Sequence, residues 1–136
     1  MSTSRIAILG IDVISASIAY ALQAREEPLE IVGFDEDRAI ADLAKVRGAL
    51  DDVRRNPAAA CEGAELIIVA QPLSKIRDVF AAIGPHVAEG AIITDTARLK
   101  APVLQWADEL LPKYVSFVGG HVIPNPAIVG LRTLEG

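Results

Sequence analysis

The chain has 136 residues, of which 51% are hydrophobic, 4% aromatic and 23% charged. That length suits one domain, residues 1–136, and the apolar content is high enough to bury a core. No apolar run approaches the roughly 18 residues that a membrane span needs. Because strand-like residues begin directly after the N-terminus, with no secretory signal before them, we expect a cytoplasmic protein that does not enter a membrane.

Thirteen basic and eighteen acidic side chains give a net charge of −5. No basic cluster is larger than Arg54-Arg55, so a nucleic-acid partner is not expected. A single cysteine, Cys61, excludes an internal disulfide and is expected to be a buried, inert thiol. One cysteine and two scattered histidines do not form a metal site.

Short β-rich segments alternate with helical periodicity along the chain. The predicted strands cover residues 5–9, 30–34, 52–54, 65–70, 91–94 and 115–118. The predicted helices cover residues 14–25 and 38–46, a short turn after Pro57, residues 76–83, and residues 103–111. This alternation predicts an α/β fold of the Rossmann type, a doubly wound, mostly parallel sheet with helices on both faces.

Ligands of such sheets bind beyond the carboxyl ends of the strands, near the switch in strand order. At the first of these ends a dinucleotide site favours the pattern Gly-x-Gly-x-x-Gly. The sequence from Gly10 to Ser15 keeps only the first glycine and places Asp12 at the second. Two interpretations of Asp12 stay open, since its carboxylate either repels a diphosphate or simply caps the helix.

Asp35 ends the second predicted strand, 25 positions after Gly10. An acid at this place accepts hydrogen bonds from a ribose and repels a 2′-phosphate, which favours NAD over NADP. The alternative is that Asp35 only caps the loop or helix that follows. The residues predicted to line a cofactor site are Gly10, Asp12, Val13, Ile14, Asp35, Ala70, Gln71, Pro72 and Asp95.

These segments together resemble the nucleotide-binding domain of the prephenate dehydrogenase family. The resemblance rests on residues 6–10, 31–35, 66–72, 76–79, 93–103 and 117–121, of which Phe-Val-Gly-Gly-His at 117–121 is the most diagnostic. It implies oxidation of prephenate or arogenate with NAD(P)⁺, coupled to loss of carbon dioxide, in tyrosine biosynthesis. It also implies that His121 binds the substrate hydroxyl and helps to remove its proton.

The sequence departs from the family pattern beyond its first turn. Where the family typically reads Asp-x-Gly-Ser-x-Lys, this chain has Asp95 to Lys100 with Arg98 in place of the serine. An arginine holds a carboxylate well, so Arg98 is a candidate catalytic-site residue that binds a small carboxylate substrate. After His121 the sequence Val-Ile-Pro-Asn replaces the usual Pro-(Met/Ile)-Ala-Gly.

The family continues into a C-terminal helical domain that supplies dimer contacts, and this domain is absent from a chain that stops at Gly136. We therefore expect a fragment that is incomplete for catalysis, with a homodimer formed through the missing part. Three hypotheses follow: an NAD-dependent dehydrogenase domain similar to prephenate dehydrogenase, a degenerate non-catalytic relative with a binding or regulatory role, and a dehydrogenase of another small acid.

Overall fold

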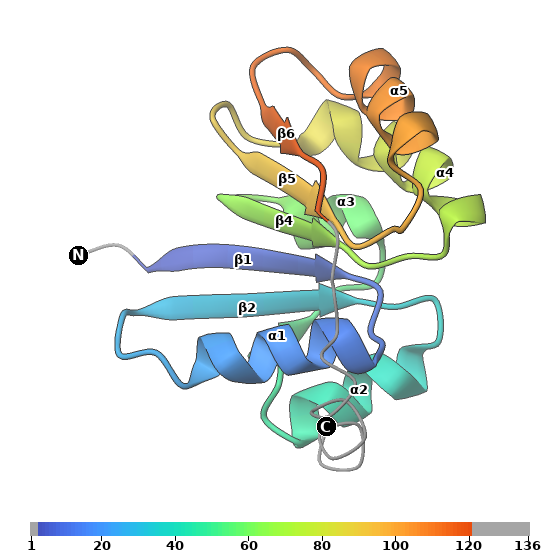
Figure 1. Ribbon diagram of the computed structural model, residues 1–136. Coiled ribbons are helices and arrows are strands. Elements are labelled where there is room, and N and C mark those ends of the chain that lie inside the picture. The colour runs from blue at the N-terminus through green and yellow to red at the C-terminus, as the bar shows by residue number, and fades with distance from the viewer. Residues whose placement is uncertain (1–2, 121–136) are drawn as a thin grey trace.

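The computed structural model describes residues 3–120 and contains one parallel sheet of six strands in the order β3-β2-β1-β4-β5-β6 (Figure 1). The strands are β1 (Ser4–Leu9), β2 (Leu29–Phe34), β3 (Asp52–Val53), β4 (Leu66–Val69), β5 (Ile92–Asp95) and β6 (Ser116–Val118). The helices are α1 (Val13–Gln23), α2 (Arg38–Val46), α3 (Pro57–Cys61), α4 (Leu73–Ile83), the 3₁₀ turn η1 (Gly84–His86) and α5 (Lys100–Leu110). This arrangement confirms the predicted Rossmann-type fold.

The central strands are buried on both faces because helices cover both sides of the sheet (Figure 1). In β1, Ile6 and Ile8 face the layer that contains α1 and α2, whereas Ala7 and Leu9 face α3, α4 and α5. Successive side chains of a strand point to opposite faces, so a nearly continuous apolar segment fills both cores at once. Phe80 on α4 is fully buried and meets Phe117 edge to face, with the ring centroids 5.5 Å apart.

Element boundaries agree with the sequence prediction apart from small shifts at several helix and strand ends. Helix α4 begins at Leu73, directly after Pro72, rather than at Ile76. Leu73 and Lys75 in its first turn are only half-buried and Ser74 is exposed, so this turn lacks the regular spacing of buried apolar residues that begins at Ile76. Helix α1 ends at Gln23 rather than at residue 25, and β6 begins at Ser116. These shifts leave the topology unchanged.

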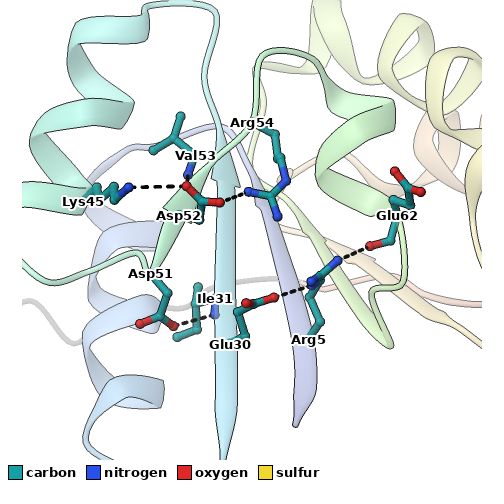
Figure 2. A network of polar contacts seen from close by, with 9 residues as sticks. All are labelled: Arg5, Glu30, Ile31, Lys45, Asp51, Asp52, Val53, Arg54 and Glu62. Atoms are coloured by element: carbon teal, nitrogen blue, oxygen red, sulfur yellow. Dashed lines mark hydrogen bonds and ion pairs between the residues drawn. The ribbon is translucent and has the colours of Figure 1, made fainter. Parts of the chain in front are cut away.

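Polar contacts hold β1, β2 and β3 to one another and to neighbouring segments (Figure 2). Arg5 on β1 forms an ion pair with Glu30 on β2 at 2.5 Å and donates a 2.9 Å hydrogen bond to the carbonyl of Glu62. The carboxylate of Asp52 on β3 is held by three donors: Lys45, Arg54 and the amide of Val53. These contacts fix the β3 side of the sheet.

None of the helices within residues 3–120 has the length and apolar character that crossing a bilayer requires.

Candidate functional site

A cleft of about 500 Å³ lies where the strand order reverses, beyond the carboxyl ends of β1, β2, β4 and β5. This is where open parallel sheets bind their ligands. Among its lining residues are eight that the sequence singled out: Gly10, Asp12, Ile14, Asp35, Ala70, Gln71, Pro72 and Arg98. Val13 and Asp95 do not line the cleft, and His121 lies outside the described residues. The fold therefore gathers most of the predicted site from four separate loops.

The turn after β1 packs tightly against the turn after β4. Gly10 has φ +97°, and a Cβ built on it would lie 2.3 Å from the carbonyl oxygen of Ala70. Both the left-handed backbone and the missing space exclude any other residue. Its amide donates a 2.8 Å hydrogen bond to the carbonyl of Phe34 on β2. Gly10 thus has the positive φ and the close packing that this turn requires of its first residue.

Asp12 caps helix α1 and also lines the cleft. Its carboxylate accepts a 2.8 Å hydrogen bond from the amide of Ser15, while its own amide donates to Oγ of Ser15 at 2.9 Å. The two residues therefore form a reciprocal capping box. Ser15 is fully buried, and its hydroxyl donates to the carbonyl of Gly10 at 2.8 Å. The capping interpretation of Asp12 is correct, and it leaves the carboxylate at the cleft wall.

The amides of Val13 and Ile14, at the start of α1, have no hydrogen-bond acceptor among residues 3–120. Such groups, together with the positive end of the helix dipole, attract anions. The carboxylate of Asp12 already supplies one negative charge to this helix end. A phosphate entering the cleft would therefore meet favourable donors and an unfavourable charge within the same turn.

Asp35 connects the turns that follow β1 and β2. One carboxylate oxygen accepts a 2.8 Å hydrogen bond from the amide of Ile11, and the other accepts one from the amide of Asp37 at 2.8 Å. Each oxygen of an ionised carboxylate has two acceptor sites, so one on each remains available beside the cleft. Asp35 can therefore accept hydroxyl donors from a ligand without losing its structural bonds.

Sequence reasoning missed an ion pair at the cleft between Glu36, in the loop after β2, and Lys75, in the first turn of α4. The two residues are 39 positions apart. Nothing in the sequence pattern pairs them, because their proximity depends on the strand order. Arg98, in the loop after β5, is exposed at the cleft and pairs with no carboxylate among residues 3–120. Its guanidinium is therefore available to an anionic ligand.

Two further candidates lie in the interior. The side chain of Asp95 is fully buried and forms a 2.5 Å ion pair with Lys100. Cys61 on α3 packs in the core, and burial raises the pKa of its thiol to about 12. A thiol with so high a pKa is not a nucleophile near neutral pH.

The strand order and the cleft define a Rossmann-type domain with its ligand site at the switch in strand order. Residues 18–133 match the family model described as prephenate dehydrogenase, nucleotide-binding domain. The chain therefore belongs to this family. The matched segment begins within α1, after the turn that holds Gly10 and Asp12.

Individual relatives agree with this assignment. The chain is 30% identical over 119 residues to a prephenate dehydrogenase of Lactococcus lactis subsp. cremoris (strain MG1363), covering 86% of this chain and 33% of that protein. It superimposes on Synechocystis arogenate dehydrogenase with a TM-score of 0.76 and 26% identity, over 86% of this chain and 40% of that chain. It also superimposes on a prephenate dehydrogenase of Aquifex aeolicus that was solved with hydroxyphenyl propionate and NAD⁺. That superposition has a TM-score of 0.74 and 20% identity and covers 90% of this chain and 43% of that chain. The chain thus spans about a third of the length of the Lactococcus relative.

Proposed function

We propose that this domain binds NAD(H) in the cleft and serves the oxidative decarboxylation of prephenate or arogenate in tyrosine biosynthesis. One observation carries the proposal: the Gly10 turn lies against Ala70 with the Asp35 carboxylate fixed beside it, in a domain of this family. The coenzyme would supply the hydride acceptor, which no side chain can provide.

The residues of the cleft fit a dinucleotide. The absence of a side chain at Gly10 lets the turn after β1 lie directly against Ala70, and the amide of Ile14, which lines the cleft at the start of α1, is a donor for a diphosphate. The two open acceptor positions of Asp35 suit the hydroxyl groups of a ribose. The same carboxylate would repel a 2′-phosphate, so we propose NAD rather than NADP.

The substrate would lie on the side of the cleft formed by the loop after β5. Arg98 provides the cation that a substrate carboxylate needs, and its planar guanidinium can form two parallel hydrogen bonds. We assign removal of the hydroxyl proton to His121, since imidazole titrates near neutral pH. Arg98 would orient the substrate, and His121 would accept its proton.

The experiment is a fluorescence titration with NADH, followed by an assay of NADH formation with prephenate and with arogenate. Asp35→Asn should weaken NADH binding by about tenfold, because hydrogen bonds to a charged acceptor are strong. Asp37→Asn is the matched control, since that acid caps α2 and does not line the cleft. Absence of saturable NADH binding up to millimolar concentrations would refute the coenzyme assignment.

A second candidate is a non-catalytic relative that keeps the fold for binding or regulation. It is favoured by the carboxylate of Asp12 at the cleft wall and by Arg98 at the usual serine position. It predicts no turnover of either substrate by the natural full-length protein. NADH formation that depends on prephenate or arogenate would refute it.

A further inference from the structure

Asp95 is a buried acid for which the proposed chemistry has no use. Its side chain is completely buried, and both carboxylate oxygens are occupied. One oxygen lies 2.5 Å from Nζ of Lys100 and 3.1 Å from the amide nitrogen of Ala97, and the other accepts a 3.1 Å hydrogen bond from the amide of Gly120. A buried carboxylate persists only when it is paired and hydrogen-bonded in this way.

The donors come from two segments beside the site. Ala97 belongs to the loop after β5 and lines the cleft next to Arg98. Gly120 follows β6, whose last partner on β5 is Thr94, paired with Val118. The carboxylate therefore continues the contact between the two strands past the point where their backbone pairing ends.

Gly120 is also held from its other side. A Cβ on this residue would lie 2.3 Å from the carbonyl oxygen of Asp95 and 3.0 Å from Oγ1 of Thr94. The backbone of Gly120 thus rests directly against β5, and only a glycine allows that approach. A hydrogen bond and a steric contact together fix the backbone of Gly120 against β5.

We propose that Asp95, neutralised by Lys100, is a positioning residue that sets the Arg98 loop and the backbone of Gly120 in one fixed relation. This inference rests on the proposed function, in which Arg98 holds the substrate and His121 takes its proton. Displacement of a reacting group by about 1 Å can cost a hundredfold in rate. A shared buried anchor prevents the two segments from shifting independently.

The test uses the full-length protein with Asp95→Asn and Gly120→Ala, which disturb the same contact from opposite sides. Each should lower kcat at least tenfold and change the dissociation constant of NADH less than threefold, because Gly10 and Asp35 lie in the turns after β1 and β2, away from this contact. Asp52→Asn is the matched control, an ion-paired aspartate on β3 that does not line the cleft and should leave kcat unchanged.

A second readout does not depend on turnover. Residues 1–136 contain two histidines, His86 and His121, and their imidazole signals in the NMR spectrum of the full-length protein are assigned by comparison with His86→Ala and His121→Ala variants. Asp95→Asn and Gly120→Ala should both shift the His121 signal and leave His86 as it is. Unchanged His121 signals would overturn the proposal. A fall in kcat that is fully accounted for by a smaller fraction of folded protein would overturn it as well.

The two proposals fail in different ways. A wild-type protein without turnover refutes the proposed function, while the His121 signal still decides whether Asp95 positions this segment. If Asp95→Asn leaves Lys100 unpaired and does not fold, the double variant Asp95→Asn, Lys100→Met removes both charges together. That variant should fold and still shift His121, and an unshifted signal in it refutes the inference.

Discussion

Asp12 makes opposing contributions to stability and to nucleotide binding, and a single substitution can separate them. Asn at this position accepts the same hydrogen bond from the amide of Ser15, so Asp12→Asn keeps the helix cap and removes only the charge. The folded state should lose less than about 1 kcal/mol, the usual value of an acid at a helix N-terminus. Binding of NADH should become stronger in the same variant.

The magnitude follows from the charge that a diphosphate would meet. Two unit charges about 4 Å apart repel by roughly 1 kcal/mol in water and about 4 kcal/mol near a protein surface. Because the cleft is open to water, we expect the lower part of this range, an affinity gain of about tenfold. Asp12→Gly should give a similar gain and lose a few tenths of a kcal/mol more stability, since glycine cannot form the side-chain cap.

The assay compares NADH with adenosine, which carries no phosphate. Asp12→Asn should tighten NADH and leave adenosine unchanged, and the gain should shrink as salt is added. Asp42→Asn changes the net charge equally from an exposed site on α2 and should alter neither ligand. Equal NADH affinity in the wild type, Asp12→Asn and Asp12→Gly would show that the carboxylate does not oppose the diphosphate.

Three other predictions concern the stability and packing of the domain. Gly10→Ala should lower the free energy of unfolding in urea by about 2 to 4 kcal/mol and abolish NADH binding, because a methyl group would collide with the carbonyl of Ala70. A loss of stability below about 1 kcal/mol would refute this steric argument. Cys61 should not react with a thiol reagent at pH 8 until denaturant is added. Burial raises the pKa of its thiol from 9.0 to about 12, which leaves about a thousandfold less thiolate. Rapid reaction of the folded protein would contradict the burial of Cys61. The pKa of Asp52 is held below its usual 3.8 by hydrogen bonds and charge from the Val53 amide, Arg54 and Lys45. The ionised carboxylate therefore stabilises the folded state fully above pH 3.8, and this stabilisation is lost as the pH falls through the lowered pKa. Asp52→Asn should therefore lower the free energy of unfolding by less than about 1 kcal/mol at pH 7, as is usual for a partly exposed ion pair. In unfolding curves recorded over a series of pH values, the wild type and the variant should become equally stable at the acid end. A stability difference that grows toward acid pH would contradict the lowered pKa.

The fold was predictable because its signal repeats along the chain. The segment at Leu66–Val69 is apolar throughout, which is typical of a central parallel strand, and the structure buries it beneath helices on both faces. Contacts between loops were not predictable in the same way. Lys75 and Glu36 meet only because β4 lies beside β1, and local periodicity carries no information on that order.

Asp95 shows where a rule based on strand ends was too coarse. The sequence analysis placed Asp95 directly after a strand at residues 91–94 and therefore at the cofactor site, whereas the structure has Asp95 as the last residue of β5. Alternation within the strand puts its side chain on the same face as Ile93, which is fully buried in the core that contains α4 and α5. Lys100, five residues later, supplies the counter-charge. The alternation from Ile93 and the following lysine are the signals that identify a buried anchor.

The turn after β1 separates what the fold needs from what nucleotide binding needs. The backbone at Asp12 is extended, with φ −129° and ψ −173°, so this conformation does not require glycine. Ser15 fills the third glycine position while fully buried, and only Gly10 adopts a positive φ in this turn. Loss of the second glycine therefore leaves the fold intact and alters only the room and the charge offered to a phosphate. For that reason the stability of the domain cannot distinguish a dehydrogenase from a non-catalytic relative, whereas the NADH affinity of Asp12→Asn, measured beside turnover, can.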